Sequence, residues 1–419
     1  MRRTILLLAS VSVAVLLAGG AALAVTPLVG ADEKNAEAGV AAAAKGPDAA
    51  LDRALKELVS MEGGPPGVIA VVQRGEKREV HTFGVAKLKS ERPMRADDRM
   101  RIASAAKAFS GAVALSLVSK GKLSLDDTID ERLSDLPEDY PEYFPGEDFP
   151  GGWSDVTLRQ LLNHTSGLPD LLGSDAFVEA LLGRLRHPDP PAKLLSYAYG
   201  LNGGEPLFDP GSEYRYSNTD NIAVALMVED ATGDSYEAQL KKRVYRPLGL
   251  KSTSLPVGPE LQKPYIHGYD LAEQPPEDVS EQIAAGWSWA SGGVVSTPAD
   301  LNAFIRGYVG GELFDGETRS QQREVFEGEG GGSSEPPGPG DNSAGLAVFR
   351  YETGCGTVWG HTGNTAGYTQ FMASSPNGRR SVVVSINAQI TLSEGDQQAF
   401  EALRRAEERA VCAALAGKG

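Results

Sequence analysis

Cysteine and histidine are scarce in this chain of 419 residues, which holds two cysteines and five histidines. None of them shows the close spacing typical of zinc ligands, so we expect no metal site. A glycine-rich segment, residues 327–345, follows no predicted strand and opens no predicted helix, which argues against a dinucleotide-binding loop. We therefore expect the protein to work without a metal or another cofactor.

Positive charge is also in short supply. Lys and Arg number 40 against 56 Asp and Glu, giving a formal net charge of −16 and a pI near 4.9. Such a chain repels polyanions, so we expect neither nucleic acid nor an anionic membrane surface as a partner. With 41% hydrophobic and 23% charged residues, the composition is that of a globular protein with one or two cores.

One long uncharged apolar run occurs, at residues 4–30, directly after two arginines. A basic start, an apolar stretch and a small-residue site ending at Ala24 predict a secretory signal peptide over residues 1–24, followed by a low-complexity linker over residues 25–47. The alternative is an uncleaved anchor, because the run is long enough to span a bilayer. We expect a protein that is secreted to the cell-wall side, or one anchored and facing outward.

The expected state of the two cysteines, Cys355 and Cys412, depends on that compartment. In an exported chain, an isolated pair is most simply one disulfide, here between the final helix and the strand region around residue 355. Two free thiols are the alternative. An oxidising compartment favours the disulfide.

Hydrophobic periodicity predicts an α/β fold. Residues 49–63 have a helical apolar period, and two strand-like segments joined by a tight turn form a hairpin within residues 67–88. Strands and a last helix return in the C-terminal part, so we expect an antiparallel β-sheet flanked by helices, built from residues 48–125 and 281–419. Residues 126–280, rich in helical segments and Pro/Gly/acidic loops, predict an inserted all-helical subdomain.

A serine and a lysine stand three apart where a helix is predicted to begin, at Ser104 and Lys107. A cation in the first helical turn is disfavoured by roughly 0.3–1 kcal/mol, which makes the lysine unexpected. The two side chains share one helix face, and a buried, neutral lysine amine would accept the serine proton and create a nucleophile. The alternative is a capping serine beside an incidental surface lysine.

A second motif, Tyr216-Ser217-Asn218, lies at a predicted junction between a loop and a helix. There, a phenol and an amide can face a substrate. The alternative is a capping role for Ser217 or Asn218.

A third motif, His361-Thr362-Gly363, lies on a predicted strand. Its glycine would let a substrate backbone lie close to the strand, because no side chain intervenes.

The three motifs in this order resemble those of the penicillin-recognising serine hydrolases: class C β-lactamases, D-alanyl-D-alanine carboxypeptidases and esterases of the same fold. The H-T-G variant is most similar to that of secreted actinobacterial D-alanyl-D-alanine carboxypeptidases. The resemblance covers roughly residues 50–415 and includes a cysteine just before the third motif paired with one near the C-terminus.

This resemblance implies a role for each catalytic residue. Ser104 would be the acylated nucleophile and Lys107 its base. Tyr216 would pass a proton to the leaving group and later activate the deacylating water. Asn218 would hold both the substrate amide and the lysine.

The same resemblance implies the substrate contacts. His361 and Thr362 would face the substrate carboxylate. Gly363 would keep the strand accessible, and the amide of Asn364 would join that of Ser104 as the oxyanion hole.

Two departures from the family pattern concern the leaving group. Histidine replaces the commoner lysine at position 361, so a positive charge there would depend on pH. A basic run is expected on the preceding strand, but Arg350 is its only basic residue, and Phe349 occupies the place where a carboxylate-binding arginine is expected. Binding of a substrate carboxylate by Arg350 is therefore left open.

From the resemblance we expect a monomeric serine hydrolase that forms an acyl-enzyme on Ser104. The expected activity is D-alanyl-D-alanine carboxypeptidase on peptidoglycan stem peptides, with β-lactams as acylating inhibitors. The alternatives are a β-lactamase or a carboxylesterase of the same fold acting on a small-molecule amide or ester, or a non-hydrolytic penicillin-binding or sensor protein.

Overall fold

The computed structural model describes residues 46–144, 151–272, 274–328, 338–391 and 397–417. The predicted signal peptide and all but the last two residues of the predicted linker lie outside these ranges. Within them, no helix is both long enough and apolar enough to cross a membrane.

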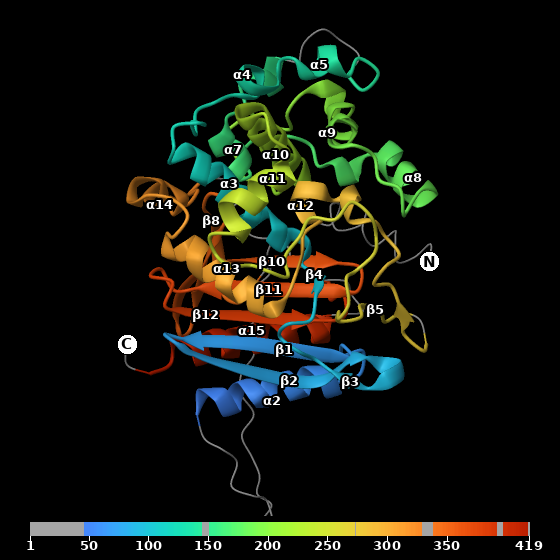
Figure 1. Cartoon of the computed structure of the whole chain (residues 1–419), viewed down its shortest axis with the longest axis vertical. Helices are drawn as coiled ribbons and strands as arrows, with labels where there is room; N and C mark the ends of the chain where they lie inside the picture. Colours follow the sequence, from blue (N-terminus) through green and yellow to red (C-terminus); the bar gives the residue numbers. More distant parts are fainter. Residues whose placement is uncertain (1–45, 145–150, 273, 329–337, 392–396, 418–419) are drawn as a thin grey trace, which may run out of the picture.

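An eight-stranded antiparallel sheet runs through the molecule in the order β3-β2-β1-β12-β11-β10-β9-β8 (Figure 1). Its strands are β1 (Gly67–Arg74), β2 (Lys77–Lys87), β3 (Arg92–Pro93), β8 (Asp341–Ala344), β9 (Phe349–Thr353), β10 (Gly356–Thr365), β11 (Tyr368–Ser374) and β12 (Arg380–Ile386). Two small pairs lie apart from it, β4 (Met100–Arg101) with β7 (Val295–Ser296), and β5 (Tyr269–Asp270) with β6 (Glu277–Asp278).

Alternation along β1 divides its side chains between the two faces of the sheet. Val68, Ala70 and Val72 belong to the core under α2 (Pro47–Ser60) and α15 (Gln397–Leu415), whereas Val71 belongs to the core on the opposite face. Burying each valine stabilises the fold by about 1.5–3 kcal/mol. Because helices cover both faces, β1 is apolar along most of its length.

Helices flank the sheet on both sides, which confirms the predicted fold class. The helices beyond α2 and α15 are α3 (Ala106–Val118), α4 (Ile129–Leu133), α5 (Leu136–Asp139), α6 (Gly151–Ser154), α7 (Leu158–Leu162), α8 (Asp175–Gly183), α9 (Pro191–Tyr199), α10 (Asn218–Thr232), α11 (Tyr236–Leu240), α12 (Trp289–Gly292), α13 (Pro298–Gly310) and α14 (Gly316–Gln322). Helix α13 begins after Thr297, whose hydroxyl accepts a hydrogen bond from the N–H of Asp300 at 3.1 Å.

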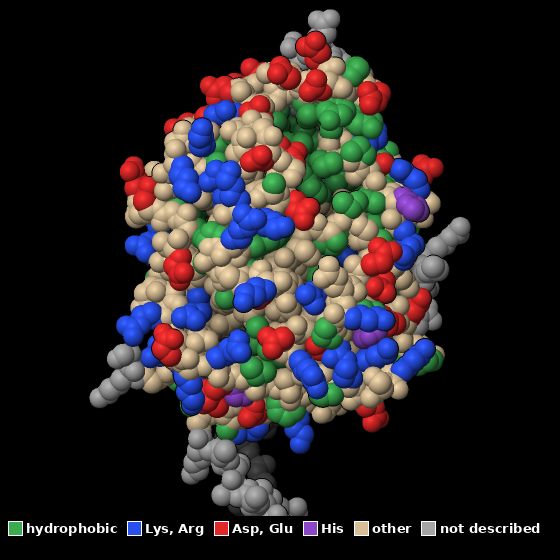
Figure 2. All heavy atoms as spheres, viewed as in Figure 1, with side chains coloured by type: hydrophobic (Ala, Val, Ile, Leu, Met, Phe, Trp, Pro, Cys, Tyr) green, Lys and Arg blue, Asp and Glu red, His purple; other side chains and the backbone are tan. Residues whose placement is uncertain are grey.

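The helices from α4 to α11 gather at the end of the molecule beyond α3 (Figure 1). Two of the short ones begin with capping boxes, at Thr128 and Thr157, which satisfy N–H groups that short helices leave open. Figure 2 shows hydrophobic side chains gathered over this part of the surface, where Figure 1 places α8 and α9. Exposed Tyr140, Leu182 and Leu207 come from this stretch of the chain.

The first and last strands of the chain meet at the middle of the sheet. β1 pairs with β12, with Val71 opposite Val383. The N–H of Gly67 donates to Oδ1 of Asn387 at 2.7 Å across 320 residues, and Nδ2 of Asn387 donates to the carbonyl of Val85 at 3.0 Å. Strands β1 and β12 and the end of β2 are thus joined by hydrogen bonds around Asn387.

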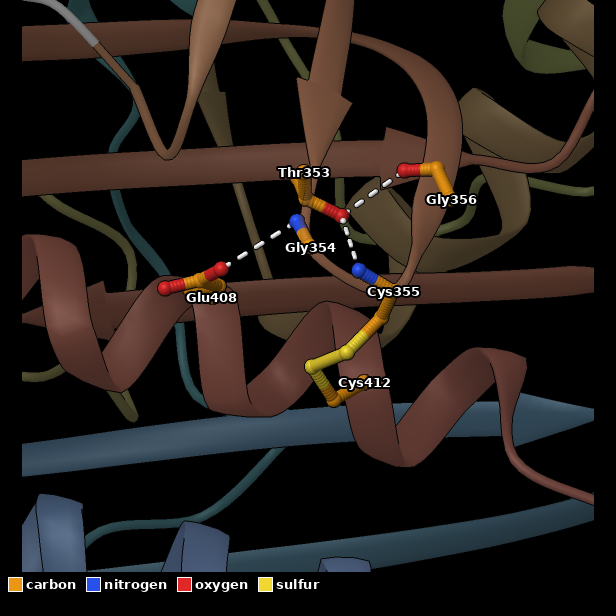
Figure 3. The surroundings of a disulfide bond; sticks show 6 residues. All are labelled: Thr353, Gly354, Cys355, Gly356, Glu408 and Cys412. Carbon is orange, nitrogen blue, oxygen red and sulfur yellow. Dashed lines mark hydrogen bonds between the residues drawn. A yellow bond between two sulfur atoms is a disulfide. The ribbon is translucent and has the colours of Figure 1, made fainter.

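A disulfide joins Cys355 to Cys412, as predicted, with their Cα atoms 5.2 Å apart (Figure 3). It ties the turn between β9 and β10 to α15. Thr353 braces the same turn, because its hydroxyl accepts from the N–H of Cys355 at 3.3 Å and donates to the carbonyl of Gly356 at 2.7 Å. The strand that carries the third motif therefore starts from a cross-linked turn.

Candidate active site

Ser104 lies in a short 3-10 turn, η2 (Ala103–Ala105), that leads into α3. Ala103 before it has φ of 48°, a left-handed conformation that costs energy for a residue with a Cβ atom and produces a sharp turn. No side chain caps the start of α3, so the capping role considered for Ser104 is wrong. The Ser104 side chain is instead partly exposed and available for reaction.

Lys107 is fully buried and its amine sits at the centre of the site. Nζ donates to Oδ1 of Asn218 at 2.7 Å and to the carbonyl of Ser291 at 2.8 Å, and it lies 3.1 Å from Oγ of Ser104. It also lies 4.9 Å from the centroid of the Tyr216 ring. The structure thus brings residues of the first and second motifs into contact around one amine.

Burial changes the acidity of that amine. Desolvation lowers the pKa of Lys107 to about 7, although the negative charges of Asp170 and Asp220 raise it. A large fraction of the amine is therefore neutral at physiological pH, which is the form that accepts a proton from a hydroxyl.

The second motif begins α10. Ser217 caps this helix by accepting from the N–H of Thr219 at 3.2 Å, which leaves Tyr216 before the helix and Asn218 as its first residue. Asp170 accepts from both the N–H and Nδ2 of Asn218, at 3.1 and 2.9 Å. The Asn218 amide is therefore held from one side by a carboxylate and from the other by Lys107.

A buried pair of titratable groups, His164 and Asp220, lies beside Tyr216. The His164 ring lies 4.5 Å from the Tyr216 ring, and its Nδ1 is 2.7 Å from Oδ2 of Asp220. Ser166 donates to the other Asp220 oxygen at 2.5 Å. Burial raises the pKa of Asp220 well above its usual range and lowers that of His164 to about 3.

The third motif lies where β10 runs past the end of its neighbour β9, whose pairing stops at Gly360. A Cβ atom on Gly363 would lie 2.3 Å from the carbonyl oxygen of Ile102 and 3.2 Å from the nitrogen of Ser104. The sequence led us to expect a substrate backbone close to this glycine. The structure shows that the backbone it admits is the chain's own, around the nucleophile.

Asn364 follows this glycine. A two-residue turn joins Thr365 to Tyr368, and hydrogen-bonded and non-hydrogen-bonded pairs alternate along an antiparallel ladder. We infer that the N–H of Asn364 points away from β11, toward the side of β10 along which β9 no longer pairs beyond Gly360. Its side chain is fixed by donating to the carbonyl of Ile390 at 2.6 Å. This arrangement agrees with an oxyanion hole formed by the N–H groups of Ser104 and Asn364.

His361 is fully buried, and its Nδ1 donates to the carbonyl of Thr362, itself buried, at 2.5 Å. Burial, helped by the nearby charge of Lys107, lowers the pKa of His361 to about 3, although the hydrogen bond to Thr362 opposes the shift. The ring meets Phe349 edge to face, with centroids 5.1 Å apart. His361 is therefore uncharged at neutral pH, and an aromatic ring lies beside it.

Arg350 has partners of its own. Nε lies 3.3 Å from a Glu352 oxygen, and Nη2 lies 3.5 Å from the Ser343 hydroxyl. On β10 its neighbour is Trp359, two residues before His361. Over the described ranges, no hydrogen bond or ion pair of Arg350 reaches the cluster around Ser104.

The motifs pointed to neither Asp170 nor the carbonyl of Ser291, although both hold the Lys107–Asn218 pair. A backbone carbonyl carries no residue signature, and a single aspartate in a loop has no spacing to identify it. Where the structure describes the chain, no three His, Cys, Asp or Glu side chains lie together in a way that would hold a metal ion.

The geometry agrees with what the chain is similar to. Penicillin-binding protein 4* of Bacillus subtilis (strain 168) is 29% identical over 48% of this chain and 41% of its own length, and the D-aminopeptidase of Brucella anthropi is 31% identical over 49% and 36%. The matches thus span less than half the length of these two relatives.

Solved structures show the same fold. A D-stereospecific amidohydrolase from Streptomyces sp. superposes with a TM-score of 0.69 and 27% identity, covering 85% of this chain and 98% of that one. The D-amino acid amidase of Ochrobactrum anthropi SV3, at 23% identity, has the same TM-score over 87% of this chain and 98% of its own. The profile of the Beta-lactamase family matches residues 51–407, so the chain belongs to the Beta-lactamase family.

Proposed function

We propose that the protein is an exported serine hydrolase that forms an acyl-enzyme on Ser104, with D-alanyl-D-alanine carboxypeptidase on peptidoglycan stem peptides as its activity. One observation carries the proposal: a fully buried lysine amine with a pKa of about 7 lies 3.1 Å from the Ser104 hydroxyl. Nucleophile and base stand at the distance that proton transfer requires.

The reaction follows from these positions. Oγ of Ser104 bonds to the substrate carbonyl carbon as its proton passes to Nζ of Lys107. The N–H groups of Ser104 and Asn364 stabilise the oxyanion. As the C–N bond breaks, Tyr216 delivers a proton to the leaving amine. A water molecule gives a proton to the Tyr216 phenolate and attacks the ester, and as the ester bond breaks the Lys107 ammonium returns its proton to Oγ of Ser104.

The aromatic ring of Tyr216 can stabilise the protonated Lys107 of the intermediate. Nζ lies 4.9 Å from the Tyr216 ring centroid, within the range in which an aromatic face attracts a cation. A β-lactam would follow the same route to a covalent ester, so β-lactams are the proposed acylating inhibitors. The D-aminopeptidase and the penicillin-binding protein among the relatives support this choice of chemistry.

A second candidate, a D-stereospecific amidase whose leaving group is uncharged, is favoured by one observation. Neutral His361 and the Phe349 ring offer no positive charge to a substrate carboxylate, and Arg350 is paired with Glu352. A free C-terminal carboxylate would then find no ionic partner at this end of the site.

One set of substrates separates these candidates. Purified protein is given diacetyl-Lys-D-Ala-D-Ala, the same peptide with a C-terminal amide, nitrocefin and p-nitrophenyl acetate, and is labelled with a fluorescent penicillin. Release of D-Ala from the acid supports the carboxypeptidase, and preference for the amide supports the amidase. Rapid nitrocefin turnover would identify a β-lactamase, ester cleavage alone an esterase, and stable labelling without turnover a sensor.

The matched variants are Ser104→Ala and, as a control on the exposed surface, Ser124→Ala. Every activity should disappear in Ser104→Ala and persist in the control. Activity that survives in Ser104→Ala contradicts the proposal. For the leaving group, His361→Lys places a cation beside Phe349 and should raise the ratio of acid to amide cleavage. An unchanged ratio would show that the side chain at position 361 does not interact with the substrate carboxylate.

A further inference from the structure

The Asp170 carboxylate accepts three hydrogen bonds, two of them from Asn218. Its Oδ2 accepts from the backbone N–H and from Nδ2 of Asn218, at 3.1 and 2.9 Å. Its Oδ1 accepts from the N–H of Leu172 at 2.9 Å, in the short turn η3 (Leu171–Gly173). Both oxygens are thus anchored, and the carboxylate has a fixed position beside the active site.

This contact decides which way the Asn218 amide points. An asparagine side chain has nearly the same shape when its oxygen and nitrogen are exchanged, so shape alone does not choose. The reverse orientation would set the amide oxygen against the Asp170 carboxylate and the amide NH₂ against Nζ of Lys107. The first contact would be repulsive, and in the second an amide N–H would occupy the lone pair of the neutral amine. Asp170 therefore keeps Oδ1 facing Lys107, at 2.7 Å.

Counting hydrogens at Lys107 shows why this orientation matters. A neutral amine has two N–H groups and one lone pair. Oδ1 of Asn218 and the carbonyl of Ser291 can only accept, so each takes one N–H. The lone pair is left for the third neighbour, Oγ of Ser104, at 3.1 Å. The amine can then only receive the serine proton.

We propose that Asp170 is a positioning residue for the acylation step, directing the lone pair of Lys107 at Ser104 by fixing the Asn218 amide. The proposal rests on the proposed Ser104 chemistry and adds a residue to it that touches neither substrate nor nucleophile. As Oγ bonds to the carbonyl carbon, its proton occupies the directed lone pair. The resulting ammonium has three N–H bonds and keeps its two acceptors.

The charge of Asp170 gives the proposal a second readout. Charged and titratable groups facing Lys107 come from several elements: Asp170, Asp220, His164 and His361. Of these, Asp170 and Asp220 raise the pKa of Lys107, and Asp170 is the larger influence. Removing its charge should let Lys107 lose its proton at lower pH.

The test compares Asp170→Asn with Asp175→Asn, a neighbouring exposed aspartate at the start of α8. Acylation is measured as the p-nitrophenyl acetate burst. The Lys107 titration is followed by NMR in protein labelled with [6-¹³C]lysine, its signal assigned by loss in Lys107→Met. Asp170→Asn should slow acylation by about 10- to 100-fold and move the Lys107 midpoint to lower pH. Asp175→Asn should match the wild type. An unchanged rate or an unchanged midpoint overturns the proposal.

Asp170→Glu separates position from charge and carries the test if Asp170→Asn does not fold. Its charge remains while its carboxylate moves by one methylene, so acylation should slow with little change in the Lys107 midpoint. Acylation of Asp170→Glu at the wild-type rate overturns the proposal. The NMR titration needs no substrate. If the wild-type protein hydrolyses nothing, the proposed function fails. The Lys107 midpoint in Asp170→Asn still decides the electrostatic part of the proposal.

Discussion

Burial of Lys107 sets the pH range in which Ser104 can react. The folded pKa is lowered from 10.5 to about 7, and the base acts only when deprotonated. We therefore predict that kcat/KM for p-nitrophenyl acetate falls about tenfold per pH unit below pH 7 and levels off above it. A profile that is flat between pH 5 and 7 would contradict this assignment.

Removing the amine tests the same residue from the other direction. Lys107→Met keeps a long side chain and should lower kcat/KM by about 10²- to 10⁴-fold, the usual contribution of a general base. Lys120→Met, at an exposed position beyond the end of α3, should leave the rate unchanged. Circular dichroism of both variants checks that the loss is not one of folding.

How far single residues could be predicted depended on what brings them together. Ser104 and Lys107 are three apart on one helical segment, so their contact follows from helix geometry. Asp170 lies in a loop 63 residues from Lys107 and holds its partner Asn218. The carbonyl of Ser291, 184 residues away in α12, accepts from the amine itself, and only the packed structure brings these groups together. The neutral state of His361 likewise depends on burial, which a motif does not report.

At the scale of elements, the approach of β10 to the turn around Ser104 depends on Gly363. In Gly363→Ala, the new methyl group would meet the carbonyl of Ile102 at 2.3 Å, so the strand or the turn must move. We predict a loss of about 1–3 kcal/mol in the free energy of unfolding and about 10²-fold in acylation rate.

The control for that variant is Gly316→Ala, at the first position of α14, where a new methyl group would have no neighbour within 4 Å. Thermal unfolding and the p-nitrophenyl acetate burst measure the two effects. Wild-type acylation in Gly363→Ala would show that the close approach of β10 is not needed for the reaction.

Helix α15 carries a second element-scale prediction at Glu407, which is fully buried. Desolvation raises the pKa of this carboxyl from 4.5 to about 8. Because the folded pKa is the higher one, folding favours the protonated form, and stability is lost as pH rises from about 4.5 through 8.

Glu407→Gln removes that titration. It should increase the free energy of unfolding at pH 8 by on the order of 2–5 kcal/mol relative to wild type, with little difference near pH 4.5. Urea unfolding at both pH values measures the change, and Glu401→Gln on the exposed face of α15 is the control. Equal pH dependence in Glu407→Gln and wild type would contradict the prediction.

Elements with strong periodicity could be predicted, and weakly patterned ones could not. The hairpin of β1 and β2, helix α2 and the strand of the third motif were predicted from the sequence. Strand β8 lies at the end of the glycine-rich segment 327–345, for which no strand was predicted, because Asp-Asn-Ser-Ala has little tendency to form a strand. Its pairing with β9 supplies what the local sequence lacks.

At the scale of the whole molecule, the disulfide closes a loop of 57 residues. In the Cys355→Ser/Cys412→Ser double variant, the unfolded chain gains freedom, and we predict a loss of about 2–4 kcal/mol in the free energy of unfolding. Both cysteines lie outside the Ser104 cluster, so kcat at 25 °C should stay near that of wild type. Calorimetry of the double variant and of disulfide-bonded wild type measures the first effect. A large loss of kcat in a folded double variant would show that the bond also shapes the site.

The pairing of β1 with β12 has a consequence for when the sheet can form during synthesis. Val71 pairs with Val383, and the Gly67–Asn387 hydrogen bond joins residues that are 320 positions apart. Contacts so distant in sequence form late and slowly, since most of the chain must be available first. The central sheet therefore cannot close while the C-terminal strand is still being made. A growing chain of this topology keeps β1 without its central partner until β12 has been made.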